Sequence, residues 1–356
     1  MRQPLAITGC ALLTPLDGPT QTTWSAIRAG KSVGTQVAVN DRLLDADESL
    51  DRSIRLALAV AKQALAGKPT DNTALFCGTS KGPVGTMLQA LQQFHERKPL
   101  NRMQATHIAL GVGAMGTLVA ERLNLPAGHT SVAACSSGLH ALHRAAQSIW
   151  RGECRRALVV AADASLHPLF PASFARLGVL SPTDPDGIRH CRPFSPDGQG
   201  FFLIEAAAAL LLEDASVASD IKPLAMLTDS WIGGDASALI AIDSSTNSLR
   251  HGLSRVATTI KPPISFIHAH ATGTTHDLHE LQAIKACVPS EVCVFSHKEW
   301  LGHSLGAAGL VSLALSIACH QNQMLPTGDP IPKLSSSLTL AQGFGGHIAI
   351  AALRGI

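Results

Sequence analysis

Two successive series of short β-like runs, each interleaved with helical stretches, constrain the fold of this chain more than any other feature. The first series comprises Pro4 to Gly9, Thr73 to Gly78, Thr130 to Ala134, Ala157 to Ala162 and Phe201 to Leu212. The second comprises Leu224 to Trp231, Ile264 to Ala269, Val292 to Ser296 and His347 to Leu353. Apolar runs of this length between helical patterns are typical of β/α units. We therefore expect an α/β protein built from two similar halves.

The two series are not separated by a low-complexity tract or a charge run. We expect an N-terminal half over residues 1–213 and a C-terminal half over residues 214–356, packed into one compact unit. The chain is 46% hydrophobic and 15% charged, a composition that supports a large buried core.

The net charge and the cysteine pattern bear on which partners the protein binds and in which compartment it lies. The formal net charge of +2 gives no support to nucleic-acid binding. The eight cysteines form no C-x-x-C pair, which favours a reduced, cytoplasmic chain. The longest apolar run, Leu305 to Cys319, is shorter than the ~20 residues of a membrane span, so it predicts a buried helix.

One cysteine stands where a strand pattern meets a helix pattern. Cys135 follows the run Thr130 to Ala134, and apolar residues then recur at helical spacing at Leu139, Leu142, Ala146 and Ile149. At a helix N-terminus the dipole and the free N–H groups favour thiolate, the nucleophilic form, so we expect a lowered thiol pKa. The competing interpretation is an inert, buried cysteine.

Two short motifs suggest other chemistry. Gly111 to Gly116 matches a dinucleotide-binding fingerprint, but no clear strand precedes it and no acidic residue follows ~20 residues later. Gly302 to Gly306 matches the nucleophile elbow of serine hydrolases, and Asp329 and His347 follow in hydrolase order. His297 to Trp300 nevertheless separates this motif from the preceding strand pattern, whereas an elbow requires a direct connection.

Four histidines, His268, His270, His276 and His279, could supply imidazole ligands to a metal ion. The turn residues Ala271 to Thr274 separate the first pair from the second and direct them apart. We therefore expect no metal site.

The segment around Cys135 resembles a known nucleophile motif. Ala134 to Gly138, read as ACSSG, is similar to that of the β-ketoacyl synthases, a family of the thiolase superfamily. Further family motifs follow in order: Ala6 to Gly9 with Thr14 to Leu16, Trp24 and Gly30 to Ser32; Arg192 to Phe194 with Glu205; His270 to Thr274 with Asp277 and Glu280; Lys298 with Gly302 and His303; Gly306 to Gly309; and Gly343 to Gly346. The resemblance covers nearly the whole chain and implies a thiolase-like, five-layered α/β/α/β/α fold.

The resemblance also implies a reaction, the decarboxylative Claisen condensation of acyl and malonyl thioesters in fatty acid or polyketide biosynthesis. Cys135 would accept the acyl group as a covalent intermediate. His270 and His303 would bind the malonyl thioester carbonyl while CO2 leaves, and a His–His pair marks the decarboxylating elongation enzymes of this superfamily. Lys298 would lie beside His303.

Supporting roles follow from the same resemblance. We expect Glu205 to be a structural residue near the site and the buried charge partner of Lys298. The backbone amides of Cys135 and Phe344 would form an oxyanion hole, and Gln342 stands where the family usually has a gating phenylalanine. The resemblance implies no bound cofactor, because substrates arrive on the phosphopantetheine of an acyl carrier protein. It also implies a homodimer, or a heterodimer with another ketosynthase, paired through the strand before Cys135.

Several positions depart from the family pattern. Ala271, Ile204 and Ala206 replace glycines. Ser195 and Gly198 replace an Asp and an Arg, and the chain is shorter than a typical elongation synthase. These changes keep a rival interpretation open, a non-catalytic subunit that resembles the chain length factors of type II polyketide or aryl polyene systems. Such subunits typically replace the cysteine, whereas this chain keeps Cys135.

Overall fold

The computed structural model describes residues 2–68, 70–214, 216–217, 222–235, 239–240 and 242–356. Its strands form one ten-stranded mixed sheet in the order β3-β2-β4-β5-β1-β6-β10-β9-β7-β8. The N-terminal strands are β1 (Leu5–Leu13), β2 (Thr73–Gly78), β3 (His129–Ser131), β4 (Arg156–Asp163) and β5 (Ala206–Glu213). The C-terminal strands are β6 (Ala225–Gly234), β7 (Ile264–His268), β8 (Cys293–Phe295), β9 (Ser336–Gly343) and β10 (His347–Arg354).

The pairing pattern of the first five strands recurs in the last five. Strand β2 is parallel to β3 and β4, and β5 is antiparallel to β4 and β1. Likewise β7 is parallel to β8 and β9, and β10 is antiparallel to β9 and β6. The prediction of two similar halves is confirmed. A boundary after residue 213 stays a prediction, supported by the end of β5 at Glu213.

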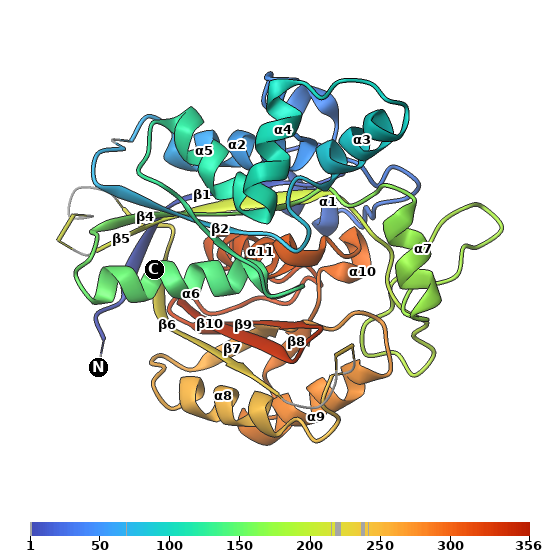
Figure 1. The fold of residues 1–356 in the computed structure, drawn as a ribbon. Coiled ribbons are helices and arrows are strands. Elements are labelled where there is room, and N and C mark those ends of the chain that lie inside the picture. The colour runs from blue at the N-terminus through green and yellow to red at the C-terminus, as the bar shows by residue number, and fades with distance from the viewer. Residues whose placement is uncertain (1, 69, 215, 218–221, 236–238, 241) are drawn as a thin grey trace.

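Helices enclose and separate the two halves of the sheet (Figure 1). Helices α2 (Arg52–Leu65) and α5 (Ala114–Leu123) lie on the outer side of the N-terminal half. Helices α6 (Ser137–Trp150) and α11 (Ala308–Asn322) lie between the halves, and α8 (Asn247–Ala257) and α9 (His276–Cys287) cover the C-terminal half. The predicted α/β/α/β/α layering is therefore confirmed. One feature was not predicted: β1 pairs with β6 through Leu5–Ile7 and joins the halves into one sheet.

Five further helices and three 3₁₀ turns complete the fold of the described residues. They are α1 (Thr20–Arg28), α3 (Val84–His95), α4 (Arg102–Leu110), α7 (Leu169–Arg176), α10 (Lys298–Leu301) and three 3₁₀ turns, Asp41–Leu43, Gly111–Gly113 and Leu305–Ala307. The helical stretch Arg102–Leu123, which combines α4, a 3₁₀ turn and α5, is long and apolar enough to span a membrane. Because Met115, Leu118 and Val119 pack into the core, we interpret its α5 part as a core helix.

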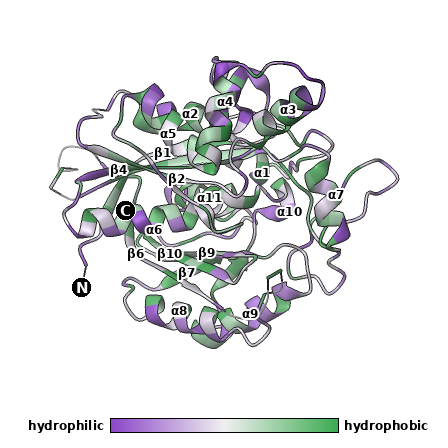
Figure 2. Cartoon of the chain, viewed as in Figure 1, coloured by the Kyte–Doolittle hydropathy of each residue, from purple (hydrophilic) through white to green (hydrophobic). Residues whose placement is uncertain are grey.

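Burial explains the composition of the helices. Every residue of α11 from Ala308 to His320 is buried, because the helix lies between the two halves of the sheet, and most of these residues are accordingly apolar. The prediction of a buried helix here is confirmed, although its first residues form a 3₁₀ turn. By contrast α8 mixes hydrophobic and hydrophilic residues (Figure 2), since only one face, with Leu249, Leu253 and Val256, is buried.

Glycines allow the two central helices to approach closely. A Cβ added at Gly138 of α6 would lie 3.1 Å from the Cβ of Leu310 in α11. A Cβ added at Gly309 would lie 2.8 Å from Leu139 Cγ, closer than carbon atoms normally pack. This contact fixes how the two halves are placed relative to each other.

We expect Gly309→Val to lower the free energy of unfolding by about 1–3 kcal/mol, because the added methyl groups overpack the contact between α6 and α11. Urea unfolding followed by circular dichroism measures this. Gly113→Ala is the control, because an added Cβ there meets no atom within 4 Å and φ is −64°, so the change should stay within about 0.5 kcal/mol. Equal effects of both substitutions would contradict the interpretation.

Candidate active site

Cys135 lies on the tight turn between β3 and α6. Ala134 adopts a left-handed conformation with φ of +46°, and α6 begins at Ser137 with Ser136 as its N-cap residue. The Ser136 hydroxyl donates to the carbonyl of Ala133 (2.7 Å), and the Ser137 hydroxyl donates to the carbonyl of Ala134 (2.6 Å). These bonds hold the cysteine directly before the helix N-terminus, as the sequence predicted.

The environment of the thiol differs from the prediction. Burial raises the pKa of Cys135 to about 12, the nearby charge of Lys298 lowers it less, and Asp163 raises it further. The expected lowering of the pKa is therefore wrong, because desolvation of a thiolate outweighs the favourable charges. At neutral pH the Cys135 side chain is therefore a protonated thiol.

Two histidines from the C-terminal half face the same cavity as Cys135. His270 follows β7, His303 precedes α11, and their ring centroids are 5.7 Å apart. Together with Cys135, Gln342 and Phe344, they line a cavity of about 60 Å³. The structure thus brings together the predicted nucleophile, both predicted histidines and the residues predicted for the gate and the oxyanion hole.

Both imidazoles are held neutral. Burial, and secondly the positive charge of Lys298, keep the pKa of His270 and of His303 well below the ordinary value. Neither ring forms a hydrogen bond to another residue in the part of the chain that the structure describes. Neutral rings that lack protein partners are free to accept or donate a hydrogen bond to a bound substrate.

Lys298 is a fully buried cation beside this pair. Its Nζ donates to the carbonyl of His270, and only 1% of the residue is exposed. Burial lowers its pKa, while Cys191 and Glu280 oppose the shift. Glu280 in turn accepts hydrogen bonds from the backbone N–H of His270 (2.7 Å) and Ala271 (2.8 Å). The lysine and the glutamate therefore hold the backbone of His270 from two sides.

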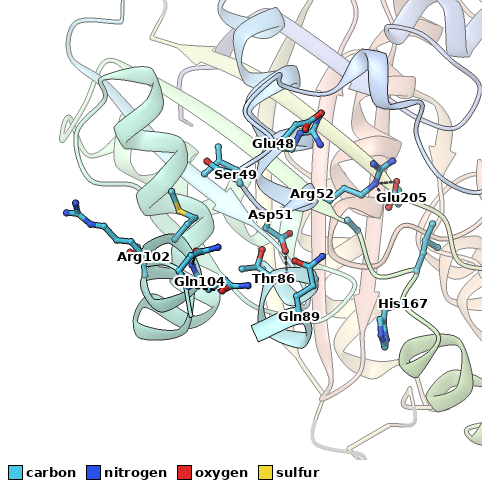
Figure 3. A pocket seen from close by; sticks show the side chains of 18 residues that line it. Glu48, Ser49, Asp51, Arg52, Thr86, Gln89, Arg102, Gln104, His167 and Glu205 are labelled. Atoms are coloured by element: carbon cyan, nitrogen blue, oxygen red, sulfur yellow. Dashed lines mark hydrogen bonds and ion pairs between the residues drawn. The ribbon is translucent and has the colours of Figure 1, made fainter. Parts of the chain in front are cut away.

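Glu205 has a different partner from the one predicted. Its carboxylate accepts hydrogen bonds from Arg52 Nε at 2.7 and 2.9 Å and from the backbone N–H of Val39 at 3.1 Å. The expectation that Glu205 pairs with Lys298 is wrong. Glu205 forms its ion pair with Arg52 of α2, and Lys298 donates instead to the carbonyl of His270. This pair borders a second cavity of about 790 Å³ (Figure 3). In the wall of this cavity the Asp51 carboxylate accepts a hydrogen bond from the backbone N–H of Thr86.

The turn after β9 packs against the nucleophile. A Cβ added at Gly343 would lie 3.0 Å from the backbone nitrogen of Cys135, so glycine is required for this close approach. Phe344 follows directly, and its ring lies 6.5 Å from that of Phe174 at the cavity wall. Gln342, the predicted gate, is 3% exposed in β9.

The alternative motifs do not form the sites they suggested. Gly111–Gly113 is a 3₁₀ turn between two helices, not a strand-to-helix turn. Helix α10 precedes Ser304, whose hydroxyl is buried without a partner among the described residues, so it is no nucleophile elbow. His268 bonds to His297, whereas His270 faces the cavity, and no cluster suited to a metal ion occurs in the described ranges.

Sequence reasoning missed Asp163. At the end of β4 its buried carboxylate accepts hydrogen bonds from Thr79 Oγ1 and from the backbone N–H groups of Ser80, Lys81 and Gly306. It thereby ties the two halves together beside the cavity. An acid at the carboxyl end of an apolar strand was the available signal.

Comparison with known proteins agrees with this geometry. The family model "Beta-ketoacyl synthase, N-terminal domain" matches residues 40–218, and "Beta-ketoacyl synthase, C-terminal domain" matches residues 224–329. The chain therefore belongs to the β-ketoacyl synthase family. In fold it resembles the ishigamide ketosynthase/chain length factor, with a TM-score of 0.87, 23% identity and 100% of both chains covered.

Curated relatives carry the same family name. The chain is 31% identical over 249 residues to 3-oxoacyl-[acyl-carrier-protein] synthase 2 of Mycobacterium leprae (strain TN), covering 62% of this chain and 59% of the relative. The aligned region thus spans about three fifths of that relative. The enzyme of the same name from Rhizobium meliloti (strain 1021) is 25% identical, with 98% of each chain aligned.

We expect alkylation of Cys135 by iodoacetamide to speed up about tenfold per pH unit between pH 7 and 9, because only the thiolate reacts and its pKa of about 12 lies above this range. Mass spectrometry of the Cys135 peptide measures the rate, and Cys135→Ala defines the background from other cysteines. A rate that levels off below pH 8 would contradict the raised pKa.

Proposed function

We propose that this chain is a β-ketoacyl-(acyl carrier protein) synthase that condenses an acyl thioester with a malonyl thioester. The observation that carries the proposal is the convergence of Cys135, His270 and His303 on one cavity, with Lys298 bonded to the backbone of His270. Similarity to named 3-oxoacyl-[acyl-carrier-protein] synthases supports it.

The reaction divides into two steps. Cys135 Sγ attacks the acyl carbonyl carbon, its proton passes to the leaving carrier thiol, and an acyl-cysteine forms. Malonyl thioester then loses CO2 while His270 and His303 bind its carbonyl oxygen, which stabilises the enolate. The enolate carbon attacks the acyl-cysteine, and the cysteine sulfur leaves and takes up a proton. The β-ketoacyl product stays on the carrier.

Supporting roles are part of the same proposal. The backbone N–H groups of Cys135 and Phe344 bind the oxyanion of the acyl carbonyl, consistent with the close packing of Gly343 on Cys135. Gln342 lines the cavity where it can restrict entry of the chain. Neutral His270 and His303 are suited to hydrogen bonding, since a charged ring would be costly at this depth.

Partners and location are part of the same proposal. Substrates would arrive on the phosphopantetheine of an acyl carrier protein; a similar solved structure is a type II PKS acyl-carrier protein in complex with its ketosynthase. The protein would be cytoplasmic, which agrees with eight free cysteines. A homodimer or a ketosynthase heterodimer would form through β3, an edge strand followed by Val132, which is 54% exposed.

One observation favours the second candidate, a non-catalytic subunit like a chain length factor. The cavity at Cys135 is only about 60 Å³, against about 790 Å³ for the cavity bordered by Arg52 and Glu205. A long acyl chain does not fit unless side chains move or a partner subunit contributes space. Retention of Cys135 and both histidines still favours an enzyme.

We expect the native chain to be a dimer at micromolar concentration and Val132→Lys to shift it toward monomer, because a charge would be desolvated at the paired edge. Multi-angle light scattering measures the mass. The control Leu334→Lys alters a residue that is 66% exposed outside this edge and should leave the dimer intact. A native chain that is monomeric alone and with a co-encoded synthase would contradict the proposed pairing.

We expect incubation with an acyl carrier protein thioester to add one acyl mass to the native chain and none to Cys135→Ala. Intact-protein mass spectrometry detects the adduct, and Cys319→Ala, a buried cysteine on α11, should still be acylated. No adduct on the native chain, together with full pathway activity of Cys135→Ala beside a competent synthase, would establish the non-catalytic alternative.

A further inference from the structure

A second pair of histidines lies buried next to the catalytic pair. His268 and His297 have no exposed surface, and His268 Nε2 lies 3.0 Å from His297 Nδ1. Neither ring lines the cavity at Cys135, and the reaction described above does not use them. Two adjacent imidazoles in a dry interior are costly unless their hydrogen bonds are satisfied, so their arrangement needs an explanation.

Both rings are anchored to α11 by hydroxyl groups. His268 Nδ1 lies 3.1 Å from Ser316 Oγ, and His297 Nδ1 lies 3.1 Å from Ser312 Oγ. Ser316 also donates to the carbonyl of Ser312 and contacts Thr339 of β9. The network therefore connects the end of β7, the start of α10 and the body of α11.

These three elements each carry one group of the active site. His268 ends β7, two residues before His270, and His297 immediately precedes Lys298 at the start of α10. His303 lies just before the 3₁₀ turn that leads into α11. The histidine pair is thus the buried hydrogen-bonded connection at which the three segments meet.

The hydrogen bonds determine which nitrogen carries each proton. The backbone N–H of His297 also points at His268 Nε2, at 3.2 Å, and this donor requires a lone pair there. His268 therefore has its proton on Nδ1, donated to Ser316. His297 has its proton on Nδ1, shared between His268 Nε2 at 3.0 Å and Ser312 Oγ at 3.1 Å, and its own Nε2 lacks a partner among the described residues. Burial and the charge of Lys298 keep the pKa of both rings well below the ordinary value, so the pair stays neutral.

We propose that His268 and His297 are positioning residues for the decarboxylation step, whose N–H···N hydrogen bond fixes His270 and Lys298 relative to His303. This inference rests on the proposed function. Cys135 comes from the turn between β3 and α6, and no hydrogen bond joins it to the network among the residues described. Of the charges that influence the pKa of Cys135, only that of Lys298 comes from the elements that the network connects, so decarboxylation should depend on the pair much more strongly than acylation of Cys135.

The test measures the two half-reactions separately. In His297→Leu we expect kcat for decarboxylation of malonyl carrier protein to fall about ten- to a hundredfold with little change in KM, because small misplacements of catalytic groups have effects of this size. Acylation of Cys135, followed by mass spectrometry, should fall by no more than about threefold, because the network acts on the thiol only through the charge of Lys298. His297→Asn keeps an N–H near the Nδ1 position and should restore most of the activity.

His320→Leu is the matched control. His320 is also buried on α11 and bonds to a serine, Ser337, through Nε2 at 2.9 Å, but it has no hydrogen bond to the network. The His320→Leu variant should lose about as much stability as His297→Leu, but it should decarboxylate malonyl carrier protein at close to the native rate. His268→Gln, which keeps an acceptor near Nε2, provides a second variant if His297→Leu does not fold.

The outcomes separate this inference from the proposed function. If the native chain neither becomes acylated nor decarboxylates malonyl carrier protein, the proposed function fails. If the native chain does both and His297→Leu decarboxylates at the native rate, the positioning role is wrong. Equal losses in His297→Leu and His320→Leu, or in both half-reactions, would also overturn it, because they would indicate a general loss of packing.

Discussion

The close contact between α6 and α11 is the constraint on which the rest of this structure depends. The two helices lie between the halves of the sheet, and Gly138 and Gly309 allow their backbones to approach. Cys135 precedes the first helix and His303 precedes the second, so the contact determines the separation of nucleophile and histidine. Asp163 reinforces it by binding backbone N–H groups from both halves. The relative positions of Cys135 and His303 are thus set by how α6 and α11 pack in the core.

A single buried cation organises the electrostatics of the site. Lys298 bonds to the backbone of His270, and its charge is among the influences on the pKa of Cys135 and of four histidines. Burial is the main reason that those imidazoles stay neutral, and the lysine charge adds to it; the same charge partly offsets the desolvation of a thiolate at Cys135. Its own burial is compensated by Glu280 and by the carbonyl it contacts. Electrostatic preorganisation of this kind requires that water be excluded, which the small cavity ensures.

Much of this arrangement could be predicted from local patterns. The strand Thr73–Gly78 matched its predicted bounds, and the helical spacing from Leu139 to Ile149 lies within α6, because the apolar periodicity of α6 is strong. Strand β9 was missed. Its Ser, Thr and Gln residues interrupt the apolar pattern expected of a buried strand, although every residue of β9 is buried. The pairing of Glu205 with Arg52 and the raised pKa of Cys135 were also missed. Both depend on which distant segments exclude water, and that information is not local.

The repeated strand order divides the candidate site between two similar units. The two halves share one pairing pattern, yet Cys135 comes from the first half, and His270, Lys298 and His303 come from the second. Neither half alone therefore contains all four groups. A substitution in one half leaves the site intact only while that half still presents its residues at the boundary with the other.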